Sequence, residues 1–310
     1  MILHAVALTV GTLLAVQASV NLQLNKGLRS PFAAAAVQLA AAWVALLVVT
    51  LASGAAAALA DADRVPGWVL LAGLASPIYI TSGILLVPRL GAVATVGLWV
   101  AGQMLASAVL DVTGAFGVPA KPGGAELIAG VALVLVGILV VISGDPSRPV
   151  PGNGSTARAW RAPGWLLLGM AAGALLPIQG AINALLREEI GAAAPVALIS
   201  FTVAVVVALL VLAVLLCARA TPWPDLPGLR RVPWWGWVGG LCAALYVTST
   251  FLLIPDIGAA ATVSLTVAGQ QLGSALIDHW GLLGLPRRRV TTLRAAGIAM
   301  LLAGSLAVQL

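Results

Sequence analysis

An internal repeat constrains this chain more than any other feature of its sequence. Residues Trp68–Pro119 align without a gap with Trp235–Pro286, and about half of the aligned residues are identical. The strongest matches are two pairs of motifs: LLVPRLGA with LLIPDIGA, and AGQMLASAVLD with AGQQLGSALID. The opening segment of each copy also repeats a glycine, a glutamine and an asparagine, with Gly11, Gln17 and Asn21 matching Gly173, Gln179 and Asn183.

The composition of the chain excludes a water-soluble domain. Hydrophobic residues make up 61% of the sequence and charged residues only 8%, with a mean hydropathy of +1.08, whereas soluble chains carry roughly 25% charged residues. A helix that crosses a bilayer needs about 20 apolar residues. Ten runs of this kind are predicted as spans: Leu3–Leu22, Phe32–Ala52, Gly67–Val87, Gly91–Leu110, Leu127–Ser143, Gly164–Leu186, Ala193–Cys217, Trp235–Ile254, Gly258–Ile277 and Leu293–Gln309.

Each copy of the repeat therefore holds five predicted spans, which is an odd number. The second copy must then lie upside down relative to the first, and such inverted repeats are typical of secondary transporters. We expect an all-α integral membrane protein of ten transmembrane helices, built as two inverted five-helix repeats at residues 1–143 and 164–310. A linker rich in Pro, Gly and Ser at residues 144–163 joins them. The third and fourth spans of each copy are expected to reverse at Pro88-Arg89 and at Pro255-Asp256.

The net charge of +6 comes from basic residues that gather on one side of the predicted membrane. Thirteen of the 16 lysines and arginines fall in loops on that side: Lys26, Arg29, Arg89, Arg148, Arg158, Arg161, Arg219, Arg230, Arg231, Arg287, Arg288, Arg289 and Arg294. The other side holds only Arg64, Lys121 and Arg187. Because basic loops stay in the cytoplasm, this pattern predicts an inner-membrane protein with both termini outside and a cytoplasmic linker. It also argues against a nucleic-acid partner.

Neutral amides are the first candidates for a substrate site, because no charged residue lies in the core of a predicted span. Gln17 and Asn21, like Gln179 and Asn183, stand four residues apart and so share a helix face. An amide is costly to expose to lipid, and transporter sites form at mid-membrane depth. Interhelical hydrogen bonding, worth about 0.6 kcal/mol on average, is the alternative role for all of these residues.

The fourth and ninth spans carry a longer polar row with one member at every turn. These rows are Thr95, Trp99, Gln103 and Ser107, and Thr262, Thr266, Gln270 and Ser274. We take Gln103 and Gln270 as the strongest candidates for substrate contact, and Thr95, Thr262 and Trp99 as further lining. Tyr79 and Tyr246 recur in the third and eighth spans and are included in the same site.

Two carboxylates, Asp111 and Asp278, close the fourth and ninth spans at opposite faces of the membrane. They would either shape the following loops by accepting backbone N–H bonds, or act as gate or coupling groups at the mouths of the pathway. With only two cysteines and two histidines in the chain, neither a metal site nor a cofactor is expected.

The paired motif A-G-Q-x-L-x-S-A-x-x-D ahead of G-x-x-G-x-P, with Q-x-x-x-N in the opening span of each half, resembles the bacterial YdcZ family. That family consists of proposed inner-membrane exporters and is placed in the drug/metabolite transporter superfamily. The usual member resembles one half of this chain, so the chain resembles a fused, duplicated form. The resemblance implies a drug/metabolite-transporter-like bundle of ten helices, and it implies no substrate. Related small multidrug transporters carry a glutamate in the first span, where this chain has Gln17 and Asn21.

The expected function is secondary transport, as an exporter, of a small polar or zwitterionic metabolite by alternating access. The alternative within transport is export of lipophilic cations held on Trp99, Tyr79 or Tyr246 through cation–π contact. A membrane enzyme or scaffold is disfavoured because no catalytic or metal-binding constellation of residues is evident. The expected partners are the lipid bilayer and a small-molecule substrate, a coupling ion is left open, and the protein is expected to be a monomer that forms an internal pseudo-dimer.

Overall fold

The fold of the chain was analysed in a computed structural model that describes all residues except 91, 122, 145–162, 286, 288, 309 and 310. The predicted linker therefore lies almost entirely outside the described residues. Within them the chain forms helices and no strand. The α-helices are α1 Ile2–Leu28, α2 Pro31–Ala52, α3 Gly67–Leu70, α4 Ala75–Leu90, α5 Ala92–Thr113, α6 Ala125–Ser143, α8 Pro163–Ile190, α9 Ala193–Cys217, α10 Val238–Ile257, α11 Ala259–Trp280 and α12 Thr292–Ala307. The 3₁₀ turns are η1 Ala55–Arg64, η2 Leu71–Leu74, η3 Ala115–Gly117, η4 Pro227–Arg231 and η5 Trp234–Trp237.

Seven of the helices in the described part of the chain are long and apolar enough to cross a membrane. They are α1, α2, α6, α8, α9, most of α5, and α10 with its preceding turn, while Gly67–Gly83 and Thr292–Ala307 are shorter apolar helices. The helix α11 is long but belongs to neither group. Every residue from Ala259 to Gly269 is buried, so protein rather than lipid surrounds this part of α11. A helix in that position can carry Thr, Ser and Gln.

The reversal between α10 and α11 differs from the sequence-based expectation. The turn was expected at Pro255-Asp256, but α10 continues through Pro255 to Ile257, and the chain reverses at Gly258. Gly258 has φ 90° and ψ 160°, a conformation that is open to glycine and costly for other residues. In the first half, α4 likewise continues past Pro88-Arg89 to Leu90. Local helix propensity cannot place these reversals, because each proline is followed by residues that can remain helical.

The third predicted span is a composite of α3, η2 and α4. Pro77 lacks a backbone N–H and cannot bond to the carbonyl of Gly73 four residues earlier. The chain tightens into the 3₁₀ turn η2 over Leu71–Leu74, where hydrogen bonds span three residues instead of four. Such turns mark local strain in a helix, so this span is regular only from Ala75 onward.

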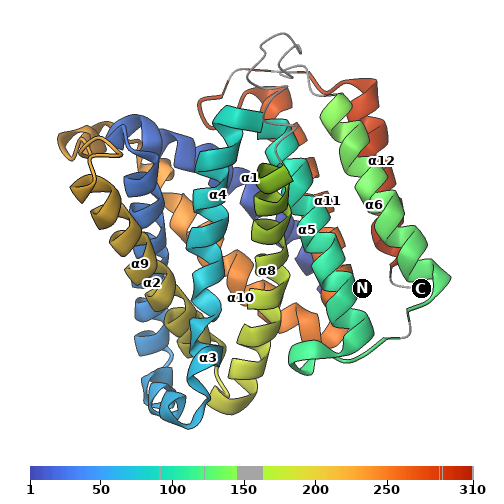
Figure 1. Cartoon of the computed structure of the whole chain (residues 1–310), viewed down its shortest axis with the longest axis horizontal. Coiled ribbons are helices and arrows are strands. Elements are labelled where there is room, and N and C mark those ends of the chain that lie inside the picture. Colours follow the sequence, from blue (N-terminus) through green and yellow to red (C-terminus); the bar gives the residue numbers. More distant parts are fainter. Residues whose placement is uncertain (91, 122, 145–162, 286, 288, 309–310) are drawn as a thin grey trace.

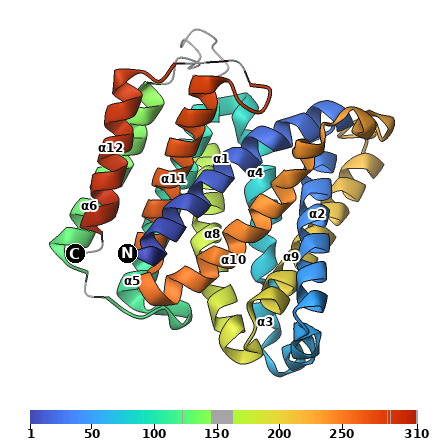
Figure 2. The same cartoon turned by 180° about the vertical axis from the view of Figure 1, so that it is seen from behind.

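The helices form a bundle with two paired edges, which Figures 1 and 2 show from opposite sides. The antiparallel pair α6 and α12 forms one edge, α2 and α9 form the other, and the remaining helices lie between them. Helices of the two halves alternate: α1 packs on α10 and α11, and α8 packs on α4 and α5. The core is therefore shared between the halves. The start of α1 and the end of α12 lie at one end of the bundle, and the end of α6 lies at the other (Figure 1).

Equivalent glycines mark the closest crossings between the halves. A Cβ at Gly11 of α1 would overlap the backbone oxygen of Thr266, and one at Gly269 of α11 would overlap that of Leu8. The equivalent crossing joins Gly173 of α8 to the oxygen of Trp99, and Gly102 of α5 to that of Met170. Helix backbones that touch at small residues are the usual close contact in membranes. The two halves thus pack on one another in matching ways.

The pair α6–α12 follows the same rule. A Cβ added to Gly137 would lie 3.0 Å from the backbone oxygen of Gly297. A Cβ added to Gly130 would lie 2.9 Å from the backbone oxygen of Gly304. In the repeat alignment Gly130 corresponds to Gly297 and Gly137 to Gly304, so each glycine faces the equivalent of the other one. Two antiparallel helices related by a local two-fold axis give this pattern.

Candidate functional site

Two aromatic residues of the first half meet between α4 and α5. The rings of Tyr79 and Trp99 have centroids 4.2 Å apart at an interplanar angle of 37°, and Trp99 Nε1 donates a hydrogen bond of 3.0 Å to Ser82 Oγ. Tyr246 is buried on α10. Of the three aromatic residues that the sequence analysis assigned to one site, the structure thus brings Tyr79 and Trp99 into contact.

The amides of the second half form a closed hydrogen-bonded cluster. Ser76 Oγ of α4 lies 3.2 Å from both amide atoms of Gln179 on α8. Ser200 Oγ of α9 accepts one bond from Gln179 Nε2 and one from Asn183 Nδ2, each at 3.2 Å. All four residues are buried. Among the buried amide atoms of this cluster, only Asn183 Oδ1 has no partner. The hydrogen bonds of the other amide atoms join α4, α8 and α9.

The equivalent amides of the first half are not closed in this way. Gln17 and Asn21 on α1 are half-buried, and their side-chain oxygens are buried without a hydrogen-bond partner among the described residues. Beside them stands Gln38 of α2, which is 1% exposed and has neither its amide oxygen nor its amide nitrogen paired. One half therefore holds an amide cluster with one unpaired buried atom, and the other holds a cluster with four.

The polar rows of α5 and α11 do not form a hydrogen-bonded network. Gln103 is 4% exposed and Gln270 is half-buried, and neither amide bonds to another described residue. Thr262 Oγ1 donates to the Gly258 oxygen of the preceding turn at 2.7 Å. Thr95 at the equivalent position is buried. Gln103 and Gln270 therefore have free hydrogen-bonding capacity, whereas Thr262 uses its hydroxyl within its own helix.

Asp111 joins the two halves at one end of the bundle. Its carboxylate, on α5, accepts hydrogen bonds from the backbone N–H groups of Ala259 at 2.6 Å and Ala260 at 2.8 Å. These groups open α11, where the helix dipole favours a negative charge. Lys121 Nζ donates to the Ile257 oxygen at 2.7 Å and so holds the end of α10. The carboxylate thus caps a helix of the other half, rather than the loop that follows it in sequence.

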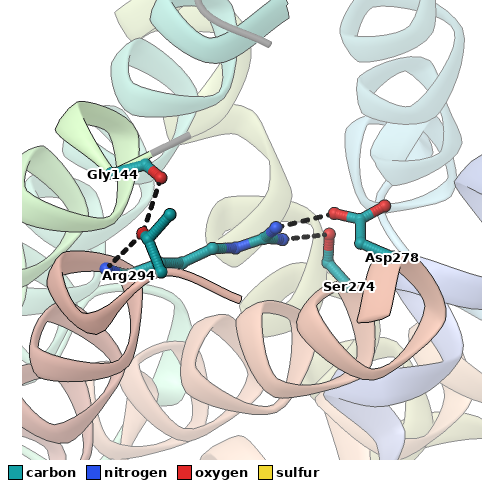
Figure 3. Close-up of polar contacts among 5 residues, drawn as sticks. Gly144, Ser274, Asp278 and Arg294 are labelled. Carbon is teal, nitrogen blue, oxygen red and sulfur yellow. Dashed lines mark hydrogen bonds and ion pairs between the residues drawn. The ribbon is translucent and has the colours of Figure 1, made fainter. Parts of the chain in front are cut away.

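Asp278 occupies the equivalent position at the opposite end of the bundle but bonds within its own half. Arg294 Nη1 of α12 donates to Asp278 Oδ2 at 2.7 Å, and Arg294 Nη2 donates to Ser274 Oγ at 3.0 Å (Figure 3). Arg294 is 4% exposed. Thr291 caps α12 by accepting from Arg294 N, and its hydroxyl donates to the Gly144 oxygen at 2.8 Å. This end of α11 is therefore tied to α12.

Sequence reasoning missed several members of these groups. Gln38 is the single amide of an otherwise apolar span, and this could have identified it as a candidate. Its repeat counterpart is Ser200, so a search for residues that recur in both halves does not find it. Lys121 and Arg294 were counted only as loop charges. The hydrogen bond of Lys121 to the Ile257 carbonyl and the ion pair of Arg294 with Asp278 have no local sequence signal. Across the described residues no group of three or more His, Cys, Asp or Glu side chains is placed to hold a metal ion.

A bundle of long apolar helices, with polar groups between them and charges at its ends, is that of an integral membrane protein. Comparison with protein families adds the class of exporter. The family described as "Putative inner membrane exporter, YdcZ" matches twice, at residues 2–140 and 164–307. The chain belongs to the YdcZ family and carries two copies of its unit, as the sequence resemblance predicted.

The comparisons with individual proteins add information on the fold. No match was found among curated proteins. Among solved structures, one crystal structure is similar over 99% of this chain and 94% of its own, with a TM-score of 0.66 and 16% sequence identity. At that identity the likeness shows a shared fold.

Proposed function

We propose that the protein is a secondary transporter that works by alternating access, built from two inverted repeats of five membrane spans each. The main support for this proposal is that the two equivalent carboxylates have different bonding partners. Asp111 bridges the halves by capping α11, whereas Asp278 pairs with Arg294 inside the second half. One end of the pathway is thus fastened across the halves. The matched glycine crossings are what two inverted copies would produce.

The proposed substrate is a small polar or zwitterionic metabolite, moved outward as the family description implies. Gln103 and Gln270 supply free amides from the two halves, and Gln17 and Asn21 supply others. Gln179 and Asn183 would line the same pathway while bonded to Ser76 and Ser200. Export of lipophilic cations is less well supported, because the Trp99 ring is packed. Tyr79 stacks against it, and the Cβ position of Gly83 lies 2.8 Å from one of its ring atoms. Little aromatic face is left for cation–π contact.

Transport is tested directly with purified protein in liposomes loaded with a mixture of cellular metabolites. We expect mass spectrometry of the external buffer to show one chemical class of small polar solutes leaving faster than from protein-free liposomes. The control is protein carrying Gly11→Leu, which has lost the helix crossing. If the release profile of the intact protein matches that of protein-free liposomes for every solute, the transporter proposal is wrong.

The orientation of the bundle forms a second prediction. The distribution of basic loops favours a cytoplasmic location for the Asp278–Arg294 end and an external one for the Asp111–Lys121 end. Reporter fusions at Gly154 and at Leu310 measure this. We expect a cytoplasmic reporter to be active at Gly154 and a periplasmic reporter to be active at Leu310. A cytoplasmic signal from the fusion at Leu310 contradicts the orientation while leaving the fold intact.

A further inference from the structure

The two amide clusters occupy equivalent places in the two halves but differ in their hydrogen bonding. The equivalence is structural as well as sequential. A Cβ at Gly240 would lie 2.7 Å from the backbone oxygen of Gln38, and a Cβ at the equivalent Gly73 would overlap the backbone oxygen of Ser200. Gln38 and Ser200 therefore occupy equivalent positions, Gln38 on α2 of the first half and Ser200 on α9 of the second. A difference between the clusters is then a difference in side chains rather than in fold.

The side chains explain why only one cluster is closed. In the cluster around Gln179 and Asn183 the short hydroxyls of Ser76 and Ser200 bond to three of the four amide atoms. In the cluster around Gln17 and Asn21, Ala243 of α10 stands at the position equivalent to Ser76, and the long carboxamide of Gln38 stands at the position equivalent to Ser200. Two small hydroxyls are thus replaced by a methyl group and a third amide. No described side chain is left to complete the set.

The open cluster lies where α1, α2 and α10 meet. A methyl group on Gly239 of α10 would lie 3.7 Å from Cδ of Gln38 and 3.8 Å from the backbone oxygen of Gln17. The carboxamide of Gln38 is thus beside the α1 turn that carries Gln17, and Asn21 follows on the same face of α1. Four buried atoms have no partner among the described residues: Gln17 Oε1, Asn21 Oδ1, Gln38 Oε1 and Gln38 Nε2.

Buried polar atoms without partners cost free energy and are rare in folded proteins. Four of them belong to this cluster, whereas its counterpart around Gln179 and Asn183 has one, Asn183 Oδ1. Carboxamides both donate and accept, so they match groups that do the same. A ligand with hydroxyl or carboxamide groups would satisfy all four atoms.

We propose that Gln17, Asn21 and Gln38 form a binding site for the uncharged hydroxyl- or carboxamide-bearing part of a small solute. This inference rests on the proposed transport function and narrows its substrate class. An uncharged group is indicated because the cluster itself is neutral. The charged side chains of the described chain lie at the ends of helices. An ion without a counter-charge is strongly disfavoured at such a buried site.

The test compares probes that share one carbon skeleton and differ in charge. Lactamide is neutral, lactate is an anion and alaninamide is a cation, and saturation-transfer NMR in nanodiscs reports their binding. We expect lactamide to give the strongest signal with the intact protein, and Gln38→Leu to reduce it at least fivefold. Gln271→Leu is the matched control, because Gln271 is a buried glutamine on α11 whose repeat counterpart is Met104.

Three results would overturn the site. One is a lactamide signal that Gln38→Leu leaves unchanged, the second is no lactamide signal from the intact protein, and the third is stronger binding of alaninamide, which would make the cluster a cation site. None of these depends on transport. A protein that binds lactamide but releases no solute from liposomes contradicts the transport function alone.

Thermal melting separates a binding role from a packing role. Gln38→Leu replaces unpaired atoms with an apolar group of similar size, so the melting temperature should stay equal or rise. Gln179→Leu removes the partner of Ser76 and one of the two partners of Ser200, and it should lower the melting temperature by several degrees. A Gln38→Leu protein that melts lower than Gln179→Leu, or that fails to fold, would make Gln38 a structural residue and contradict the proposal.

Discussion

Gly11→Ala is expected to destabilise the protein severely, by more than about 4 kcal/mol, a range that single substitutions seldom reach. The added Cβ would overlap the backbone oxygen of Thr266. Backbone atoms cannot rotate away as a side chain can, so α1 and α11 would have to separate along the crossing. Gly173→Ala should have a similar effect, because the added Cβ would overlap the backbone oxygen of Trp99.

Gly164→Ala is the matched control for these substitutions. Gly164 is also helical, but it is exposed and no atom lies within 4 Å of its Cβ position. Because alanine favours a helix over glycine by up to about 1 kcal/mol, this variant should melt at or slightly above the temperature of the unmodified protein. Gel filtration in detergent and thermal melting measure both effects. A monodisperse Gly11→Ala protein with an unchanged melting temperature would show that the crossing is not tightly packed.

The second large effect is expected from Asp278→Ala, which leaves the Arg294 guanidinium buried without a counter-charge. Arg294 is 4% exposed, and its Nε already lacks a hydrogen-bond partner. Removing one member of a buried pair costs about 3–5 kcal/mol, and the partial exposure of Asp278 places this case near the lower figure. The melting temperature should fall accordingly.

An exposed ion pair in the same chain provides the control. Arg64 Nη1 lies 2.8 Å from Asp61 Oδ1, but the Arg64 side chain is 77% exposed. Exposed ion pairs contribute about 0–1 kcal/mol to the free energy of unfolding. Asp61→Ala should therefore leave the melting temperature nearly unchanged. Asp278→Ala combined with Arg294→Met should recover part of the loss, because the buried charge is then absent. Equal losses for the single and double variants would show that the pair is not coupled.

The all-helical architecture and the places of the apolar helices along the chain follow closely from the sequence, but the helix ends do not. The apolar run Leu3–Leu22 places α1, yet the helix continues to Leu28 through Asn25 and Lys26, because a helix can leave the lipid without unwinding. The composite third span and the reversal at Gly258 depend on backbone geometry that hydropathy does not record. The low apolarity of α11 reflects its burial by other helices, which is a tertiary property.

The candidate site was predictable in part for a similar reason. Repetition identified Gln17, Asn21, Gln179 and Asn183, because each half preserves the amides at the same spacing. It could not show that serines close one cluster and Gln38 leaves the other open, since that difference is a departure from the repeat. The roles of Asp111 and Asp278 depend on which helix end comes within reach, and no periodicity in the sequence reports this.

The glycine crossings also limit how the molecule can move. At Gly11, Gly173 and their partners the backbones touch, and nothing compressible lies between them. Helices in such contact can tilt about the point where they meet but cannot part there. Opening by a tilt produces a wedge, narrow at mid-depth and wide at one end. In a transporter of the proposed kind, the width of a solute, more than its length, would then decide whether it passes.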